Sequence, residues 1–270
     1  MAIYEKKRFL IWGKTAPELS TKYFETVCTG GVLEDGTPIR LYPIPFRYLD
    51  EGDRFKKYQW MTALVGKDSC DPRPESYRID CDSIEAGRVI EPDNLEWQAR
   101  REFVLQSPSW QFESVDALLE AQVRTKQSLG IVAPKEIISV GLHPRPDDEE
   151  TSFEQKRERC HRKFEADRQR LFEDFFPAEY KQIDFVKNRI QVVWKCGSGK
   201  SHTMQFMDWE IVEVQRKFGD EKALQMVKEH MDLSKYAIRF FLGNLRAFPT
   251  SFTIVGLWYP KRQTGLLFLN

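Results

Sequence analysis

The sequence predicts an α+β protein with a small antiparallel β-barrel or sandwich at its N-terminus, followed by a mixed α/β domain that carries one long charged helix. Short β-prone runs alternate with turn residues over residues 1–90, which is typical of small all-β units. From Pro92 onward, apolar residues recur at helical spacing. Residues 153–175 are almost free of helix breakers and dense in charge, which predicts the long helix.

Four strands are expected in the N-terminal part, because each run is short, apolar or β-branched, and bounded by turn residues. They are Phe9–Trp12, Thr26–Thr29, Ile39–Tyr42 and Gln59–Val65. Between the second and third runs, Asp35-Gly36 predicts a hairpin turn, since glycine adopts the positive φ that such turns require. Alternation along the third run places Arg40 and Tyr42 on one face of its strand.

The rest of the chain mixes helices with strands. Helices are expected at 95–100, at 115–126 with Ser114 as the N-cap, and at 221–231. Strands are expected at 137–142, 189–195 and 252–258, whereas 208–218 fits either a strand or the start of a helix. The Pro-rich and then acidic stretch 143–150 predicts an exposed loop. We therefore expect a β-rich domain with a helical extension at 1–146 and an α+β domain at 151–270.

Composition excludes several classes of protein. Lys plus Arg and Asp plus Glu both number 41 among the 270 residues, so no global field attracts nucleic acid or an anionic membrane, and such affinity requires a local patch. No apolar run approaches the roughly 20 residues of a membrane-spanning helix, and we expect no membrane partner. Five scattered cysteines without CxxC spacing favour free thiols and a reducing, cytoplasmic location.

A local basic and aromatic patch does occur, over residues 40–48, 54–60 and 73–78. Grooves that bind nucleic acid typically combine cationic side chains, which contact the phosphates, with aromatic side chains, which stack on the bases. The residues expected to bind nucleic acid are Arg40, Tyr42, Arg47, Lys56, Lys57, Arg73 and Arg78. The alternative interpretation is that the rings form the barrel core and the cations keep strand edges soluble. Asp50, Glu51 and Asp53 interrupt the positive run.

The segment Cys196–Met204 resembles the phosphate-binding loop of kinesin motors, and it follows an expected strand. That resemblance implies a loop whose backbone N–H groups surround a phosphate, with Lys200 and Ser201 on the nucleotide and its magnesium ion. However, Trp194 stands where the pattern requires its first glycine. We therefore favour a Gly-Ser hairpin turn, with phosphate binding as the alternative.

Two further clusters suggest metal chemistry. Cys196 and His202 supply half of a zinc site, and Cys160 with His161 would supply the other half if the fold joins them. Asp208 and Glu210 would share one face of a strand, as acids do in magnesium-dependent nucleases, with Lys200 as a further weak catalytic candidate. No cofactor is expected, and a bound divalent metal is the alternative.

The leading hypothesis is a nucleic-acid-binding accessory protein whose N-terminal barrel makes the contacts and whose C-terminal domain docks a protein partner. The basic and aromatic patch motivates it, since no nucleophile elbow or dinucleotide motif is present in the sequence. The first alternative is a metal-dependent nuclease or phosphoesterase that uses Asp208 and Glu210. The second is a structural subunit of a larger complex, held to its partner by the long charged helix.

Overall fold

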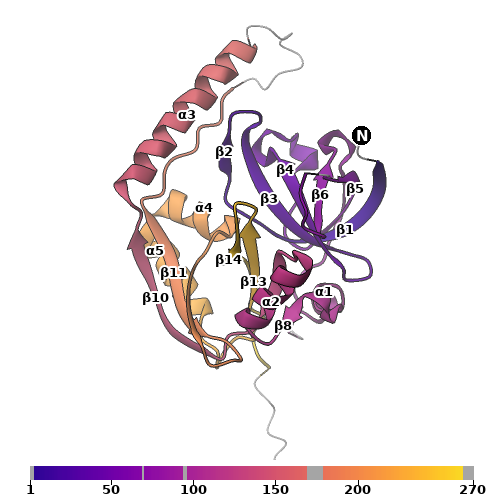
Figure 1. Cartoon of the computed structure of the whole chain (residues 1–270), viewed down its shortest axis with the longest axis vertical. Helices are drawn as coiled ribbons and strands as arrows, with labels where there is room; N and C mark the ends of the chain where they lie inside the picture. The colour runs from indigo at the N-terminus through magenta and orange to yellow at the C-terminus, as the bar shows by residue number, and fades with distance from the viewer. Residues whose placement is uncertain (1–2, 69, 94–95, 169–178, 264–270) are drawn as a thin grey trace, which may run out of the picture.

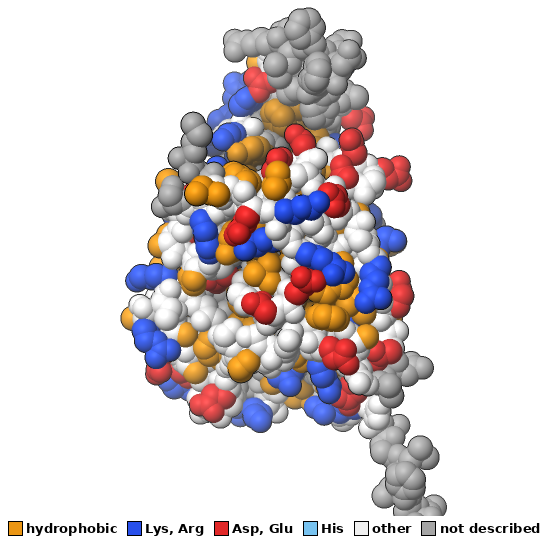
Figure 2. Space-filling model, turned by 90° about the vertical axis from the view of Figure 1, so that its right-hand side faces the viewer, with side chains coloured by type: hydrophobic (Ala, Val, Ile, Leu, Met, Phe, Trp, Pro, Cys, Tyr) orange, Lys and Arg blue, Asp and Glu red, His pale blue; other side chains and the backbone are white. Residues whose placement is uncertain are grey.

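The computed structural model describes residues 3–68, 70–93, 96–168 and 179–263. Figure 1 shows an N-terminal barrel that lies beside a second body of sheets and helices, with helix α3 projecting from the side of that body. Figure 2 views the molecule from the right-hand side of Figure 1, where the barrel lies. Cationic and acidic side chains are interspersed over this face. Exposed ion pairs on the barrel include Lys6–Glu85 at 2.7 Å and Arg8–Glu34 at 2.8 Å.

The N-terminal strands close into a five-stranded barrel, which confirms the barrel that the sequence predicts. Its strands are β1 (Tyr4–Lys14), β3 (Phe24–Leu33), β4 (Pro38–Ile44), β5 (Gln59–Lys67) and β6 (Ser76–Ile79). They are ordered β1-β3-β4-β6-β5, and β5 pairs back to β1. All of these pairs are antiparallel except β4–β6. Two shorter strands, β2 (Glu18–Ser20) and β7 (Glu85–Val89), extend the sheet beside β3 and β5.

Alternation along the strands fills the barrel. Phe9 and Ile11 of β1 and Ile39 and Leu41 of β4 are all buried in one core cluster, as expected when every second side chain points inward. The predicted turn is present between β3 and β4. There Gly36 has φ +78°, and Asp35 accepts a hydrogen bond from the Thr37 N–H at 2.9 Å.

The second body contains two sheets. One has the order β14-β13-β9-β8 and consists of β8 (Gln111–Phe112), β9 (Leu129–Val132), β13 (Arg239–Leu245) and β14 (Phe248–Trp258). The other consists of β10 (Glu136–Pro144), β11 (Asn188–Lys195) and β12 (Ser201–Gln205), all antiparallel. Apolar side chains of both sheets, including Trp194 and Phe240, share one core. The molecule is therefore α+β.

Five α-helices are described. They are α1 (Gln98–Val104), α2 (Val115–Thr125), α3 (Asp147–Arg168), α4 (Trp209–Phe218) and α5 (Asp220–His230). Short 3-10 helices lie at η1 (Phe46–Tyr48), η2 (Glu51–Asp53), η3 (Cys81–Ser83) and η4 (Pro108–Trp110). Ser114 caps α2 as expected, since its hydroxyl accepts the Ala117 N–H at 3.1 Å. Of the helices in the described part of the chain, none has the length and apolar character needed to cross a membrane.

One expectation about the middle of the chain needs correction. The loop predicted at 143–150 is instead the end of β10 and the first turn of α3, where four acidic residues suit the positive end of the helix dipole. The domain division expected between 146 and 151 stays a prediction; strand pairing joins β9 to β13 and β10 to β11. Residues 169–175 of the expected long helix lie outside the described residues.

The barrel and the second body share an apolar interface. Trp12 of β1 stacks on Phe241 of β13 with a centroid distance of 4.6 Å, and Trp110 packs on both rings. The Trp12 indole N–H donates to the Gly31 carbonyl at 3.0 Å, which fixes the ring over β3. A Cβ atom on Gly30 would lie only 2.0 Å from this indole. Glycine at position 30 is therefore required for the close approach.

We expect Gly30→Ala to destabilise the protein by about 2 kcal/mol or more, because a rigid buried indole and two strands would have to shift. Urea denaturation of the purified chain measures the change. Gly141→Ala in β10 is the matched control, since no atom lies within 4 Å of its added Cβ. Equal free energies of unfolding for the two variants would contradict this account of the interface.

Candidate functional site

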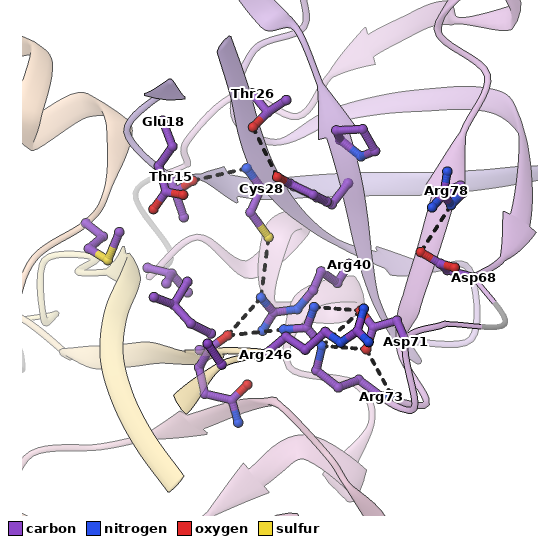
Figure 3. A pocket seen from close by; sticks show the side chains of 18 of the residues that line it. Thr15, Glu18, Thr26, Cys28, Arg40, Asp68, Asp71, Arg73, Arg78 and Arg246 are labelled. Carbon is purple, nitrogen blue, oxygen red and sulfur yellow. Dashed lines mark hydrogen bonds and ion pairs between the residues drawn. The ribbon is translucent and has the colours of Figure 1, made fainter. Parts of the chain in front are cut away.

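A cavity of about 480 Å³ lies where the barrel meets the β13–β14 hairpin. The barrel contributes β3, β4, the segment after β1 and the loop after β5, while the hairpin forms the opposite wall. Figure 3 shows Thr26 and Arg40 on these strands, with Arg246 of the hairpin turn nearby. The size falls within the range of about 300–1,000 Å³ that is usual for ligand sites.

Cationic side chains outnumber acidic ones in this cavity. It is lined by Lys22, Arg40, Arg73, Arg78 and Arg246, against Glu18, Asp68 and Asp71. Arg73 pairs with Asp71 at 2.6 Å and Arg78 with Asp68 at 3.1 Å. Within the described ranges, no carboxylate lies in ion-pair contact with Lys22, Arg40 or Arg246.

Arg40 is the most deeply placed of these cations, with 4% of its surface exposed. Its guanidinium donates to the Ser128 carbonyl at 2.9 Å and the Asn244 carbonyl at 3.2 Å, and its Nε has no partner. The buried Glu75 carboxylate reaches this group only through Ser128, whose hydroxyl donates to Glu75 Oε1 at 2.7 Å. A buried guanidinium is costly without an anion beside it, and the cavity wall is where one can approach.

An exposed ring stands beside these cations. Tyr42 of β4 is 46% exposed and accepts a hydrogen bond from Thr26 Oγ1 at 3.3 Å, and Tyr23 lines the same cavity. Several other rings of the predicted patch are not available. Phe46, Tyr58 and Trp60 are buried, because a small barrel uses most of its aromatic residues as core.

Four of the seven residues predicted to bind nucleic acid, Arg40, Tyr42, Arg73 and Arg78, line this cavity. The other three do not. Arg47 pairs with the buried Glu25 at 2.5 Å, Lys57 is held by carboxylates, and Lys56 is exposed outside the cavity. The sequence analysis missed Lys22, Tyr23 and Arg246. The feature that could have indicated Arg246 is its position in a two-residue turn between β13 and β14, where side chains are exposed.

The acidic pair has a different role from the one expected. Asp208 is the N-cap of α4 and accepts the Glu210 N–H at 2.9 Å, so the two carboxylates start a helix instead of sharing a strand face. Lys57 Nζ lies 3.3 Å from an oxygen of each. Although burial opposes the charged form of Lys57, these carboxylates raise its pKa. Lys57 thus bridges the two carboxylates.

Lys14 lies beside this group, under an aromatic surface. Its Nζ is 4.3 Å from the ring centre of Phe46 and 5.3 Å from that of Trp209. Burial lowers the pKa of Lys14 to about 8, although Glu210 and Asp208 oppose the shift. The amine therefore releases its proton more readily in the folded chain than in the unfolded one, where the pKa is 10.5.

This shift predicts how stability depends on pH. Between about pH 8 and pH 10 the unfolded state binds more protons at Lys14 than the folded state, so stability should rise with pH relative to Lys14→Met. Urea denaturation of both proteins across this range measures the difference. Lys7→Met is the control, because the Glu5 contact raises the pKa of Lys7. Lys7 therefore stays protonated in both the folded and the unfolded state over this pH range. A difference that does not vary with pH would contradict the prediction.

Cys196 and His202 do come together, as expected, with 3.2 Å between Sγ and Nε2. Cys160 and His161 do not join them: on α3, Cys160 packs with Leu19 and Ile183, and His161 contacts Tyr180. Burial opposes the thiolate, but the Ser198 hydroxyl and the Val115 N–H lower the pKa of Cys196 overall. Burial lowers the pKa of His202.

Lys200 lies in the turn between β11 and β12, so the predicted hairpin turn is present. Its ammonium pairs with Asp116 Oδ1 at 2.8 Å. Trp194, at the position where a phosphate loop needs glycine, is fully buried in the core. The antiparallel β11–β12 hairpin also lacks the helix that follows a phosphate loop.

Two family models match the chain. The first, described as Domain of unknown function (DUF8758), matches residues 5–106, which contain the barrel. The second, described as Domain of unknown function (DUF8757), matches residues 111–270. No curated protein and no solved structure matches the chain. Because the second model spans more than half of the sequence, the chain belongs to the DUF8757 family.

Proposed function

We propose that the protein is a nucleic-acid-binding accessory protein that holds a single-stranded segment in the cavity between the barrel and the β13–β14 hairpin. The observation that carries the proposal is the grouping of Lys22, Arg40 and Arg246, which have no carboxylate in ion-pair contact within the described residues, beside the exposed Tyr42 ring. Cations for the phosphate and a ring for the base are the two elements of sequence-tolerant single-strand binding.

The polar geometry favours a phosphate as the anion. Arg40 and Arg73 both donate to the Asn244 carbonyl, at 3.2 and 3.3 Å, so two guanidinium groups converge on one point of the cavity wall. Planar guanidinium groups bind phosphate oxygens through paired hydrogen bonds.

The position of the cavity on the barrel gives further support. Five-stranded Greek-key barrels of the OB type bind oligonucleotides and oligosaccharides over their second and third strands and the loops after strands one and four. Here β3 and β4 are the second and third barrel strands, and the segments after β1 and β5 complete the lining. This support is an analogy of architecture, and the site chemistry must carry the function.

A strand longer than one nucleotide has a continuous path. A second cavity of about 260 Å³ shares Glu18, Met207 and Leu245 with the first, so the two adjoin. The second cavity is also lined by Arg145, Arg189 and Arg216. These arginines are paired with Glu149 or Glu213, so we assign the principal phosphate contact to the first cavity.

The accessory role rests on α3. Only Cys160 and Phe164 are buried along its 22 described residues, and the helix projects from the second body in Figure 1. A charged helix with most of its surface free suits docking to a protein partner. The alternative of a purely structural subunit shares this helix but predicts no affinity for nucleic acid.

Charge reversal in the cavity tests the proposal. We expect the wild-type chain to bind labelled single-stranded DNA or RNA at about 50 mM salt and to lose affinity steeply as salt rises. Lys22→Glu and Arg246→Glu should each reduce the slope of log K against log salt by about one. Lys56→Glu is the matched control, because Lys56 is exposed outside the cavity. Absence of salt-sensitive binding, or equal losses in all three variants, would refute the proposal.

Replacement of the ring tests base stacking. Tyr42→Ala should weaken binding about tenfold or more, since one stacked base contributes about 1–3 kcal/mol. Tyr42→Phe keeps the ring and should bind nearly as tightly as the wild type, although it lacks the bond from Thr26. Fluorescence anisotropy with the same oligonucleotides gives both values. If the two variants bind alike, Tyr42 does not stack on a base.

A further inference from the structure

A cluster of metal-binding side chains lies at the junction of the β11–β12 turn and helix α2, away from the barrel. It consists of Asp116, Cys196 and His202, each of which offers a ligand atom within 4.8 Å of the other two. Among the described residues, this is the one group of three or more such side chains that could hold an ion. Asp116 is some eighty positions distant in sequence from the other two, so the fold itself assembles the group.

The backbone is shaped for this contact. The Gly197 N–H donates to the Glu113 carbonyl at 3.0 Å, which ties the turn to the residues that precede α2. A Cβ on Gly197 would lie 2.3 Å from that carbonyl oxygen, so only glycine allows the approach. Cys196 follows directly after β11, and His202 pairs with Trp194 across the hairpin. Both side chains are thus held by hydrogen-bonded strands opposite the first turn of α2.

The ligand atoms of this cluster, one sulfur, one nitrogen and one carboxylate oxygen, indicate which metal it would bind. Thiolate, imidazole and carboxylate are all common zinc ligands, and in a tetrahedral site neighbouring ligand atoms are separated by roughly 3.4–3.6 Å. Cys196 Sγ and His202 Nε2 are 3.2 Å apart, close to that spacing. The Ser198 hydroxyl lies 3.1 Å from Cys196 Sγ and 2.9 Å from Asp116 Oδ2. It is therefore near the fourth ligand position of such a tetrahedral site.

Lys200 is the one cation paired with Asp116, and its position is compatible with a metal. It contacts Oδ1 at 2.8 Å, whereas Oδ2 faces Ser198. A carboxylate that binds a metal through one oxygen is commonly hydrogen-bonded at the other. The side chain of Lys200 is 66% exposed, so it can also move toward solvent when the ion binds.

We propose that the chain binds one Zn²⁺ ion through Cys196 Sγ, His202 Nε2 and Asp116 Oδ2, with water or the Ser198 hydroxyl at the fourth position. The ion fastens the β11–β12 hairpin to the N-terminus of α2. This site is independent of the cavity on the barrel, so the failure of either proposal leaves the other intact.

Metal binding by the full chain, without a histidine tag, tests the site. After removal of metal with a chelator, the protein should take up about one Zn²⁺ per chain and melt at a higher temperature with the ion bound. Co²⁺ in place of zinc should give the charge-transfer band of a thiolate ligand. Cys196→Ser should abolish this band, and Asp116→Asn should weaken metal binding about 10–100-fold, an effect typical of altered metal-site residues.

Cys70→Ser is the control variant, because Cys70 is an exposed thiol of the barrel and its loss should leave the band unchanged. Asp116→Asn keeps the shape of the side chain, so it reports on the site even if Cys196→Ser fails to fold. A wild-type chain that takes up no zinc would overturn the proposal. So would a cobalt band that persists in Cys196→Ser, or unaltered affinity in Asp116→Asn.

Discussion

The packing of Trp12 against Phe241 is the contact on which the arrangement of the molecule depends. It joins the first barrel strand to β13 at a centroid distance of 4.6 Å, within a buried apolar cluster to which both bodies contribute. Because β13 continues directly into the β13–β14 turn, the same contact holds that turn opposite β3 and β4. The cavity between them is thus a consequence of how the two bodies pack, and neither body forms it alone.

Two buried cations at this junction, Lys57 and Arg40, are held by different kinds of partner. Lys57 crosses from the barrel to Asp208 and Glu210 and is neutralised by them, which fits a tie between the two bodies. Arg40 also crosses, but it ends on the carbonyls of Ser128 and Asn244. Arg40 is thus held by hydrogen bonds to carbonyl oxygens, whereas Lys57 forms an ion pair with each carboxylate.

Local patterns predicted much of the fold because they depend on near neighbours. The Asp35-Gly36 turn, the Ser114 cap and the alternation of Arg40 with Leu41 need only the residues beside them. Arg40 and Tyr42 line one cavity for the same reason, since they lie two residues apart on one strand. Arg47 and Lys57 do not line it, and their ion-pair partners, Glu25 and Asp208, are remote in sequence. The β9–β13 pairing, which moves residues 129–132 into the second body, is equally non-local.

The turn after β11 illustrates why the same residues support different interpretations. Glycine, serine and lysine suit a phosphate loop because they allow close backbone approach and add charge, and they suit a tight hairpin for the same reasons. Their neighbours distinguish the two. Trp194 is buried by strand alternation, which requires an extended chain up to Cys196. Gly197 then meets the backbone before α2 instead of a nucleotide, and this contact brings Asp116 to Cys196 and His202.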